Sequence, residues 1–257
     1  MRTSSDRCRK IDMGVSLSVC MATCNGSCFI RSQLESILEQ LGPDDELVVS
    51  DDASTDDTLA IVSSYRDPRI RILSGPEFKS PIRNFEHTLR HARGRILVLS
   101  DQDDLWLPGR LDLIHERLDS EVEQVSLIMM DGEIVDATGR CLENSIFKAH
   151  KAGPGILKNI YDNTYSGCCL AFTRPLLELA LPFPLRIPMH DMWLGLLAEI
   201  FGRVEFVPVK TIRYRRHTAN TSFIRPQVYE QISRRTFLSL NLVVRCIDIR
   251  FFRHEIS

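Results

Sequence analysis

Three carboxylates stand within four positions of the chain, at Asp101, Asp103 and Asp104. They directly follow the apolar run 96–99, which predicts a buried strand, and they precede Pro108, where a helix can begin. Close like charges at the end of a buried strand repel one another and resist ionisation, so they cost folding free energy. Mg²⁺ prefers oxygen ligands and often joins one or two carboxylates to the phosphates of a substrate. The segment therefore predicts a metal-assisted nucleotide site at the carboxyl end of a sheet.

A simpler interpretation is that these acids cap the helix that begins near Pro108. Capping needs one acid rather than three. The number of carboxylates therefore favours the metal site over the cap.

Alternating strands and helices are expected to position the acids. Apolar runs predict buried strands, and apolar residues at helical spacing fall between them. The predicted strands are 15–22, 46–50, 70–73 and 96–99, and the predicted helices cover 29–41, 54–65 and 84–92. This alternation predicts an α/β fold, a Rossmann-like, mostly parallel sheet with helices on both faces.

Ligands of such sheets bind beyond the carboxyl ends of the strands. Three predicted strand ends are polar, at 23–25, 51–52 and 101–104, and we expect them to converge on one crevice. Ser54 and Asp57 have the spacing of a capping box for the second helix.

The second half of the chain has a less regular pattern. Residues 141–165 are expected to be irregular or partly helical. Strands are predicted at 127–130, 133–135, 167–172, 204–207 and 211–214, and helices from about Pro175 and over 191–202.

Composition is that of a globular protein with a substantial core. The 257 residues are 44% hydrophobic and 26% charged, and the formal net charge of −2 gives no case for nucleic-acid binding. Eight cysteines form no C-x-x-C pair, and the N-terminus resembles no signal peptide, so we expect reduced thiols in the cytoplasm. No apolar run is long enough to cross a bilayer.

The two ends of the chain differ in character from the middle. Residues 1–14 are polar and are expected to be disordered, whereas the tail 223–257 mixes apolar residues with arginines. The tail is either a basic amphipathic helix that lies on a membrane surface or a C-terminal helix packed on the domain.

Four motifs, in order, resemble glycosyltransferase family 2, whose members have the GT-A fold. These are Met21–Gly26, Asp51–Thr58, Ser100–Trp106 and His190–Trp193, and the resemblance covers roughly residues 15–222. The D-Q-D-D-L-W form at 101–106 looks most like bacterial rhamnosyltransferases and related enzymes of surface polysaccharide synthesis. One departure is Cys24, where the family usually has Tyr or Phe.

The resemblance implies transfer of a sugar from a UDP- or dTDP-sugar to a hydroxyl of a glycan or lipid-linked glycan, with inversion. By the same resemblance, Asp103, Asp101 and His217 would hold Mn²⁺ or Mg²⁺, and Asp191 would be the general base. Donor-binding residues would be Ala22, Thr23, Asn25, Asp51, Asp52, Arg83, Asn84, Ser100, Asp101, Gln102 and Arg216, with Arg215 as the alternative to Arg216. Acceptor-binding residues would be Trp106, Gly167, His190 and Trp193.

Ordinary structural roles compete with several of these assignments. Asp51 and Asp52 would also favour the N-terminus of the following helix. Asn25 fits a plain strand-to-helix turn, and Asp191 fits an N-cap, which is compatible with a role as base.

The resemblance also implies a division of the chain. Residues 15–120 would bind the nucleotide-sugar, and 121–222 would bind the acceptor and catalyse. The basic amphipathic tail 223–257 lies beyond the resemblance, and an acceptor at the inner face of the membrane would fit its basic character. Two other functions stay open: a sugar-1-phosphate nucleotidyltransferase, and a non-catalytic nucleotide-sugar or glycan-binding protein. The first needs a Gly-rich basic loop after the first strand, which residues 23–27 lack.

Overall fold

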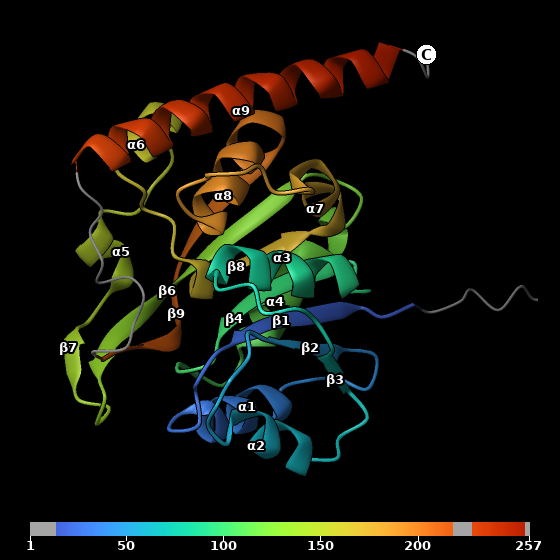
Figure 1. Ribbon diagram of the computed structural model, residues 1–257, viewed down its shortest axis with the longest axis vertical. Helices are drawn as coiled ribbons and strands as arrows, with labels where there is room; N and C mark the ends of the chain where they lie inside the picture. The colour runs from blue at the N-terminus through green and yellow to red at the C-terminus, as the bar shows by residue number, and fades with distance from the viewer. Residues whose placement is uncertain (1–13, 218–227, 255–257) are drawn as a thin grey trace, which may run out of the picture.

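The structure is a computed structural model that describes residues 14–217 and 228–254 (Figure 1). Side chains at 228–232 and 249–254 are not described. The predicted disordered segment 1–14 lies outside the described residues, apart from Gly14.

The first half alternates strands and helices, as predicted. The elements are β1 (Leu17–Thr23), α1 (Ile30–Leu38), β2 (Glu46–Asp51), α2 (Thr58–Ser64), β3 (Ile70–Leu73), α3 (Pro81–His91), β4 (Ile96–Asp101), β5 (Leu105–Trp106) and α4 (Arg110–Leu118). Local sequence explains where α3 begins: the Ser80 side chain accepts a hydrogen bond from the Arg83 amide, and Pro81 occupies the first turn.

The second half contributes longer strands and the remaining helices. They are β6 (Ser126–Asp136), β7 (Cys141–Glu143), α5 (Ile146–His150), α6 (Ile156–Tyr161), β8 (Leu170–Thr173), α7 (Arg174–Ala180), α8 (His190–Phe201), β9 (Arg203–Arg216) and α9 (Val228–His254). Short 3₁₀ turns cover Asp119–Glu121 and Gly167–Cys169.

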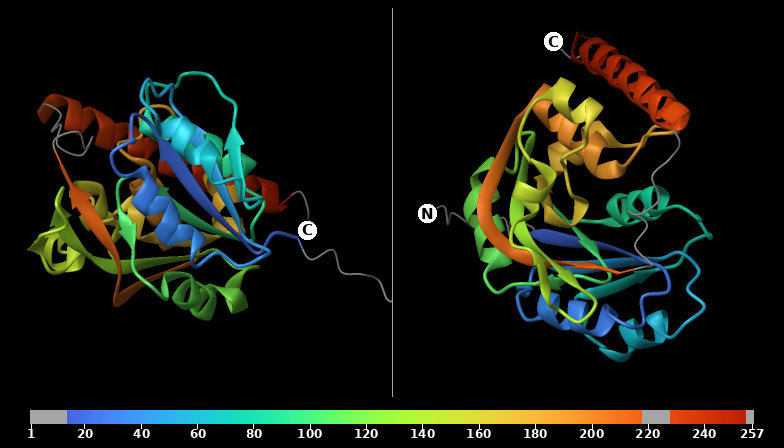
Figure 2. Two further views of the ribbon diagram at one scale, coloured as in Figure 1. Left: turned by 90° about the horizontal axis from the view of Figure 1, so that it is seen from below. Right: turned by 90° about the vertical axis from the view of Figure 1, so that its left-hand side faces the viewer.

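One mixed sheet runs through the described chain in the order β3-β2-β1-β4-β8-β6-β9-β5, and β7 pairs with β6. Strands β1 to β4 are parallel, whereas β8 is antiparallel to both of its neighbours. The helices α1 and α2 lie on one face and α3 on the other (Figures 1 and 2). The predicted α/β architecture is confirmed.

Strand register brings the polar strand ends to one edge. Ala22 pairs with Asp101, and Thr23 pairs with Asp51. Because β8 runs antiparallel to β4, its amino-terminal end lies beside the carboxyl end of β4, and the turn Gly167–Cys169 reaches the same edge. The convergence expected from the sequence therefore occurs.

Several predicted boundaries are wrong. The segments 127–130 and 133–135 form the single strand β6, and 204–207 and 211–214 form the single strand β9. The predicted strand 167–172 begins as a 3₁₀ turn and is extended only from Leu170. The capping box predicted at Ser54 and Asp57 does not form: α2 begins at Thr58, and the Ser54 amide and hydroxyl both donate to Asp51.

Helix α9 packs against the domain through one face. Leu238 and Leu242 are buried, and the Arg245 guanidinium donates to the carbonyls of Leu179, Leu181 and Pro182. The packed-helix alternative is therefore observed, and α9 lies across the outer side of α8 (Figure 1). Its other face is exposed and apolar, with Leu240, Val243, Val244 and Ile247.

Two smaller expectations concern the thiols and the membrane. The seven cysteines among the described residues are all free, whereas Cys8 lies outside them. Within 14–217 and 228–254, no helix combines the length and apolar character needed to span a bilayer.

Candidate active site

The acids at 101–104 meet the end of β9. Asp104 is fully buried, and its Oδ1 accepts the Arg215 amide at 3.0 Å. Asp103 Oδ2 lies 2.7 Å from His217 Nε2. Side chains two residues apart on a strand share a face, so β9 turns both Arg215 and His217 toward the acids.

Phe29, immediately before α1, contacts both of these residues. The Arg215 guanidinium lies over the Phe29 ring at 4.8 Å, and the His217 ring centroid lies 4.9 Å from it. A cation above an aromatic face is attracted by the ring's quadrupole. The first loop and the last strand therefore meet at this ring.

Burial makes the acids expensive to ionise. It raises the pKa of Asp101 to about 7, and the carboxylates of Asp103 and Asp191 add to the effect. It also raises the pKa of Asp104 well above its ordinary value, again reinforced by Asp103 and Asp101. Asp104 Oδ2 is buried and has no hydrogen-bond partner. A divalent cation would remove both penalties.

The donor set fits Mg²⁺ or Mn²⁺. Asp101, Asp104 and Cys168 bring potential ligand atoms within 4.8 Å of one another, and Asp103 with His217 adds a carboxylate and an imidazole beside them. Carboxylate oxygens suit Mg²⁺ and Mn²⁺, whereas a thiol suits softer metals. Asp101, Asp103 and Asp104 are therefore the better candidate ligands.

The acids do not cap α4, so the capping interpretation is wrong. The N-cap of α4 is Gly109, which has no side-chain hydrogen bond, and the Arg110 amide donates to Gln40 Oε1 instead. The cluster of acids needs another explanation, and a cation supplies one.

Gln102 holds the first loop in place. Its amide accepts from the Cys24 N–H and donates to the Cys24 C=O, both at 2.9 Å. A Cβ at Gly26 would lie 2.2 Å from Gln102 Oε1, so only glycine permits this approach. Asn25 Oδ1 accepts the Thr55 amide at 2.8 Å. Gln102 and Asn25 thus shape the loop through its backbone.

Asp51 and Asp52 organise two further loops. Asp51 accepts a hydrogen bond from the Thr23 hydroxyl at 2.6 Å and hydrogen bonds from the amide and the hydroxyl of Ser54. Asp52 accepts the backbone amides of residues 78–80 at 2.5 to 3.1 Å. Both carboxylates stabilise the walls of the predicted donor crevice.

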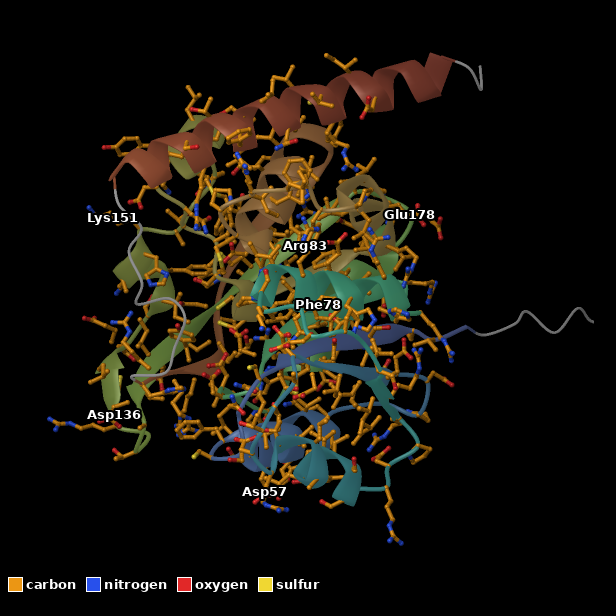
Figure 3. The ribbon with its side chains drawn as sticks, viewed as in Figure 1. Asp57, Phe78, Arg83, Asp136, Lys151 and Glu178 are labelled. Carbon is orange, nitrogen blue, oxygen red and sulfur yellow. The ribbon has the colours of Figure 1, made fainter. Side chains whose placement is uncertain are left out.

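Asn84 and Arg83 differ in their surroundings. Asn84 Nδ2 donates to the Thr23 carbonyl at 3.1 Å, and its buried Oδ1 has no partner. Arg83 pairs with Glu86 and donates to the Phe183 carbonyl at 3.1 Å, so it links α3 to the loop before α8. In Figure 3, Arg83 lies above Phe78, on the side toward α8 and α9.

Asp191 lies in the first turn of α8, 7% exposed. Burial raises its pKa to about 6, although its Oδ1 accepts the Met192 amide at 2.6 Å and Asn163 Nδ2 at 3.2 Å. A Cβ at Gly167 would lie 3.8 Å from the Asp191 Cβ. A buried carboxylate with this pKa is ionised at neutral pH and still basic enough to accept a proton.

His190 is buried against Gly167, and its ring centroid lies 4.3 Å from that of the tilted Phe85 ring. Burial lowers the pKa of His190 to about 4, so the ring is neutral at pH 7. Neither ring nitrogen has a hydrogen-bond partner, and a Cβ at Gly167 would lie 3.1 Å from Nε2. Gly167 and His190 therefore lie beside Asp191.

Four predicted site residues lie in other surroundings. Trp106 is buried beneath Arg110, and Trp193 is fully buried and donates to the Ala180 carbonyl at 3.0 Å. Ser100 is a buried partner of Gln33. Arg216 pairs with Asp136 in the β-ladder and points to the face opposite that of Arg215 and His217. Ala22, the remaining donor candidate, is beside Asp101 at the sheet edge.

Sequence reasoning missed Asn163 as a site neighbour, and it placed Cys168 beneath the acceptor site without a role of its own. Asn163 lies in the segment expected to be irregular, and no periodic signal linked it to Asp191. Cys168 lies in a short 3₁₀ turn that the apolar pattern assigned to a strand. The adjacent glycine at 167 was the available signal, since it allows close approach to His190.

Comparison with known proteins decides the family. Residues 18–177, more than half of the chain, match the model of Glycosyl transferase family 2. The chain belongs to this family. The sequence-based resemblance to the family is confirmed.

Three bacterial proteins illustrate the similarity. The chain is 33% identical over 132 residues to the succinoglycan biosynthesis protein ExoO of Rhizobium meliloti (strain 1021), covering 51% of this chain and 37% of that protein. It is 23% identical over 189 residues to the Escherichia coli UDP-Glc:alpha-D-GlcNAc-diphosphoundecaprenol beta-1,3-glucosyltransferase WfgD. This match covers 71% of this chain and 70% of that protein. It is 37% identical over 98 residues to the dTDP-rhamnosyl transferase RfbG of Shigella flexneri, covering 35% and 34%. The chain thus spans about a third of ExoO and RfbG and most of WfgD.

Solved structures share the fold. Staphylococcus aureus TarS 1-349 in complex with UDP-GlcNAc gives a TM-score of 0.70 at 23% identity, covering 88% of this chain and 67% of that one. The mannosyltransferase PcManGT from Pyrobaculum calidifontis, in complex with GDP-Man and Mn2+, gives 0.59 at 23% identity, covering 80% and 58%. These likenesses confirm the predicted GT-A fold.

Proposed function

We propose that this chain is an inverting glycosyltransferase of bacterial polysaccharide synthesis, which moves a sugar from a UDP- or dTDP-sugar to a hydroxyl of a glycan or lipid-linked glycan. The observation that carries the proposal is the meeting of a crowded acid cluster with Asp191, a buried carboxylate whose pKa is about 6, at one sheet edge. The family match supports the reaction class. The names of WfgD and RfbG support a UDP- or dTDP-linked donor, and RfbG supports rhamnose as a candidate sugar.

Asp191 is the proposed base. The acceptor hydroxyl loses its proton to the Asp191 carboxylate as its oxygen bonds to the anomeric carbon. The bond from that carbon to the donor's diphosphate breaks on the opposite side, and the nucleoside diphosphate leaves with the electron pair. One displacement inverts the configuration. The neutral His190 and the neighbouring Gly167 border the acceptor side.

Asp101, Asp103, Asp104 and His217 are the proposed holders of Mn²⁺ or Mg²⁺. When bound, the cation offsets the negative charge that develops on the departing diphosphate. The complex of PcManGT with GDP-Man and Mn2+ supports this chemistry. Arg215 already contacts the backbone of Asp103 at 2.9 Å and places its charge beside the same acids.

The remaining assignments divide the chain. Residues 15–120 are the proposed donor half and 121–222 the acceptor half. The exposed apolar face of α9 supports peripheral contact with the inner face of the cell membrane. Asp51, Asp52, Gln102 and Asn25 shape the donor crevice by fixing its loops.

A panel of nucleotide sugars with and without Mn²⁺ tests the proposal. Thermal stabilisation by UDP- or dTDP-sugars should require the metal, and the matching sugar should release nucleoside diphosphate, slowly without acceptor and faster with one. Binding without any release would refute a transferase and leave a binding protein. Pyrophosphate-dependent formation of nucleoside triphosphate would instead identify a nucleotidyltransferase.

A further inference from the structure

A cavity of about 440 Å³ lies between the start of α3, the loop before α8, and α9. Among the described residues, the lining includes three arginines and no carboxylate. The charged lining residues are Arg83, Arg186 and Arg234. A cavity whose charged lining residues are all cations is suited to an anion, and guanidinium groups bind phosphate oxygens in a bidentate way.

The three arginines differ in the contacts that they make outside the cavity. Arg83 is paired with Glu86, which also pairs with Arg90, so this group of three carries a net positive charge. Arg186 is exposed, lies over the Phe237 ring at 5.1 Å, and makes no ion pair within the described chain. Arg186 therefore brings to the cavity a positive charge that no carboxylate of the described chain pairs with.

The cavity lies on the acceptor side of the proposed site. Ile187 lines it and precedes Asp191 by four residues. Arg83 joins the opposite wall to the same loop through the Phe183 and Pro184 carbonyls. The cavity thus adjoins the loop that leads into α8 and Asp191, and its lining residue Arg83 lies on the side of α3 that faces α8 and α9 (Figure 3).

An apolar path leads from the cavity along α9. Phe237 lines the cavity, and Leu240 and Val244 follow it by three and seven residues, so the three side chains share one side of the helix. Leu240 is 59% exposed and Val244 46% exposed. An anionic ligand with a long apolar substituent could bind the cavity through its charge and the exposed side of α9 through its apolar part.

We propose that this cavity binds the diphosphate of a prenyl-diphosphate-linked acceptor, whose prenyl chain leaves along the exposed face of α9. This inference rests on the proposed transferase function and specifies its acceptor class. It makes the cavity an anion site separate from the acids that would hold a cation for the donor's diphosphate. The arginines fix the acceptor's anchor while the terminal sugar reaches toward Asp191.

Direct binding to the full chain, without donor or metal, tests the proposal. The probes are farnesyl diphosphate, farnesol and inorganic pyrophosphate, measured by calorimetry. Farnesyl diphosphate should bind best, because it alone offers both the charge and the apolar chain. The double variant Arg186→Gln/Arg234→Gln should weaken it by about 10–100-fold, the scale of one or two lost charge-assisted hydrogen bonds.

Two controls separate the possible causes. Arg140→Gln removes an exposed arginine at the β6–β7 turn and should leave all affinities unchanged. UDP binding with Mn²⁺ should be equal in the wild type and the double variant. The single variant Arg186→Gln changes only an exposed side chain, so it keeps the test valid if the double variant fails to fold.

Three outcomes would overturn the inference. These are equal affinity for farnesol and farnesyl diphosphate, an unchanged affinity in Arg186→Gln/Arg234→Gln, and competition between UDP–Mn²⁺ and farnesyl diphosphate for one site. A different result would refute the transferase proposal: no metal-dependent UDP binding and no release of nucleoside diphosphate from any donor.

Discussion

Replacing Asp191 with asparagine should make the protein more stable and much less active. Burial raises the Asp191 pKa from its ordinary value of 3.8 to about 6. Raising a pKa by one on folding is equivalent to about 1.4 kcal/mol, so ionised Asp191 costs the folded state at most ~3 kcal/mol. Asparagine keeps an acceptor for Met192 and Asn163 without the charge.

The sign of the pH dependence follows from the raised pKa. The unfolded carboxylate ionises near pH 3.8 and the folded one near 6, so the penalty is absent below the lower value. It grows as pH rises between the two values and is complete above pH 6. The wild type should therefore lose more stability over this window than Asp191→Asn, in which only the raised pKa values of Asp101 and Asp104 still contribute a loss.

Thermal melts at pH 4, 6 and 8 measure the effect. At ~2–4 °C per kcal/mol for a domain of this size, Asp191→Asn should melt up to roughly 6–12 °C higher at pH 8. Asp162→Asn, at an exposed carboxylate nearby, is the matched control and should not change the profile.

Turnover of the same variant completes the test. Loss of a positioned base typically costs ~10²–10⁴-fold in rate, while donor binding should persist. In the wild type, kcat should rise with pH through about 6 and then level off. Near-normal turnover in Asp191→Asn, or a lower melting temperature at pH 8, would refute the reasoning.

Three further variants probe the donor and acceptor sides. Asp103→Ala should abolish Mn²⁺-dependent UDP binding; unchanged affinity by calorimetry would exclude Asp103 as a ligand. Gln102→Ala removes two hydrogen bonds to the Cys24 backbone, so the KM for the donor should rise about tenfold while the protein stays folded. A KM equal to that of the wild type would show that the loop keeps its conformation without Gln102. Gly167→Ala places a methyl group 3.1 Å from His190 Nε2 and should lower kcat more than donor affinity; the reverse pattern would move Gly167 to the donor side.

The parallel half of the fold was predictable because its signals are local. Each buried strand there is a short apolar run bounded by polar residues, and the helices repeat at 3.6 residues. β9 was harder, because Pro208 interrupts the run and the pairing with β6 skips from Val207 to Lys210. Proline is tolerated at such an irregularity, so the strand continues where the sequence suggested two.

The acids of the site were predictable from their number and position, whereas side-chain direction was not. Trp106 and Trp193 have the size of ring platforms for a sugar, yet packing draws both into the core. The choice between Arg215 and Arg216 depends on the phase of β9, which the sequence alone leaves open by one residue. Asn163 joins Asp191 only through tertiary contact.

The late position of β9 has a consequence for synthesis. Asp101 to Asp104 leave the ribosome about a hundred residues before Arg215 and His217, their partners across the site. Amino-terminal segments generally begin to fold during translation, so the nascent sheet carries its acids uncompensated until the last strand arrives. Added Mg²⁺ should therefore stabilise the folded part of a ribosome-bound chain halted before residue 213 more than it stabilises the finished protein.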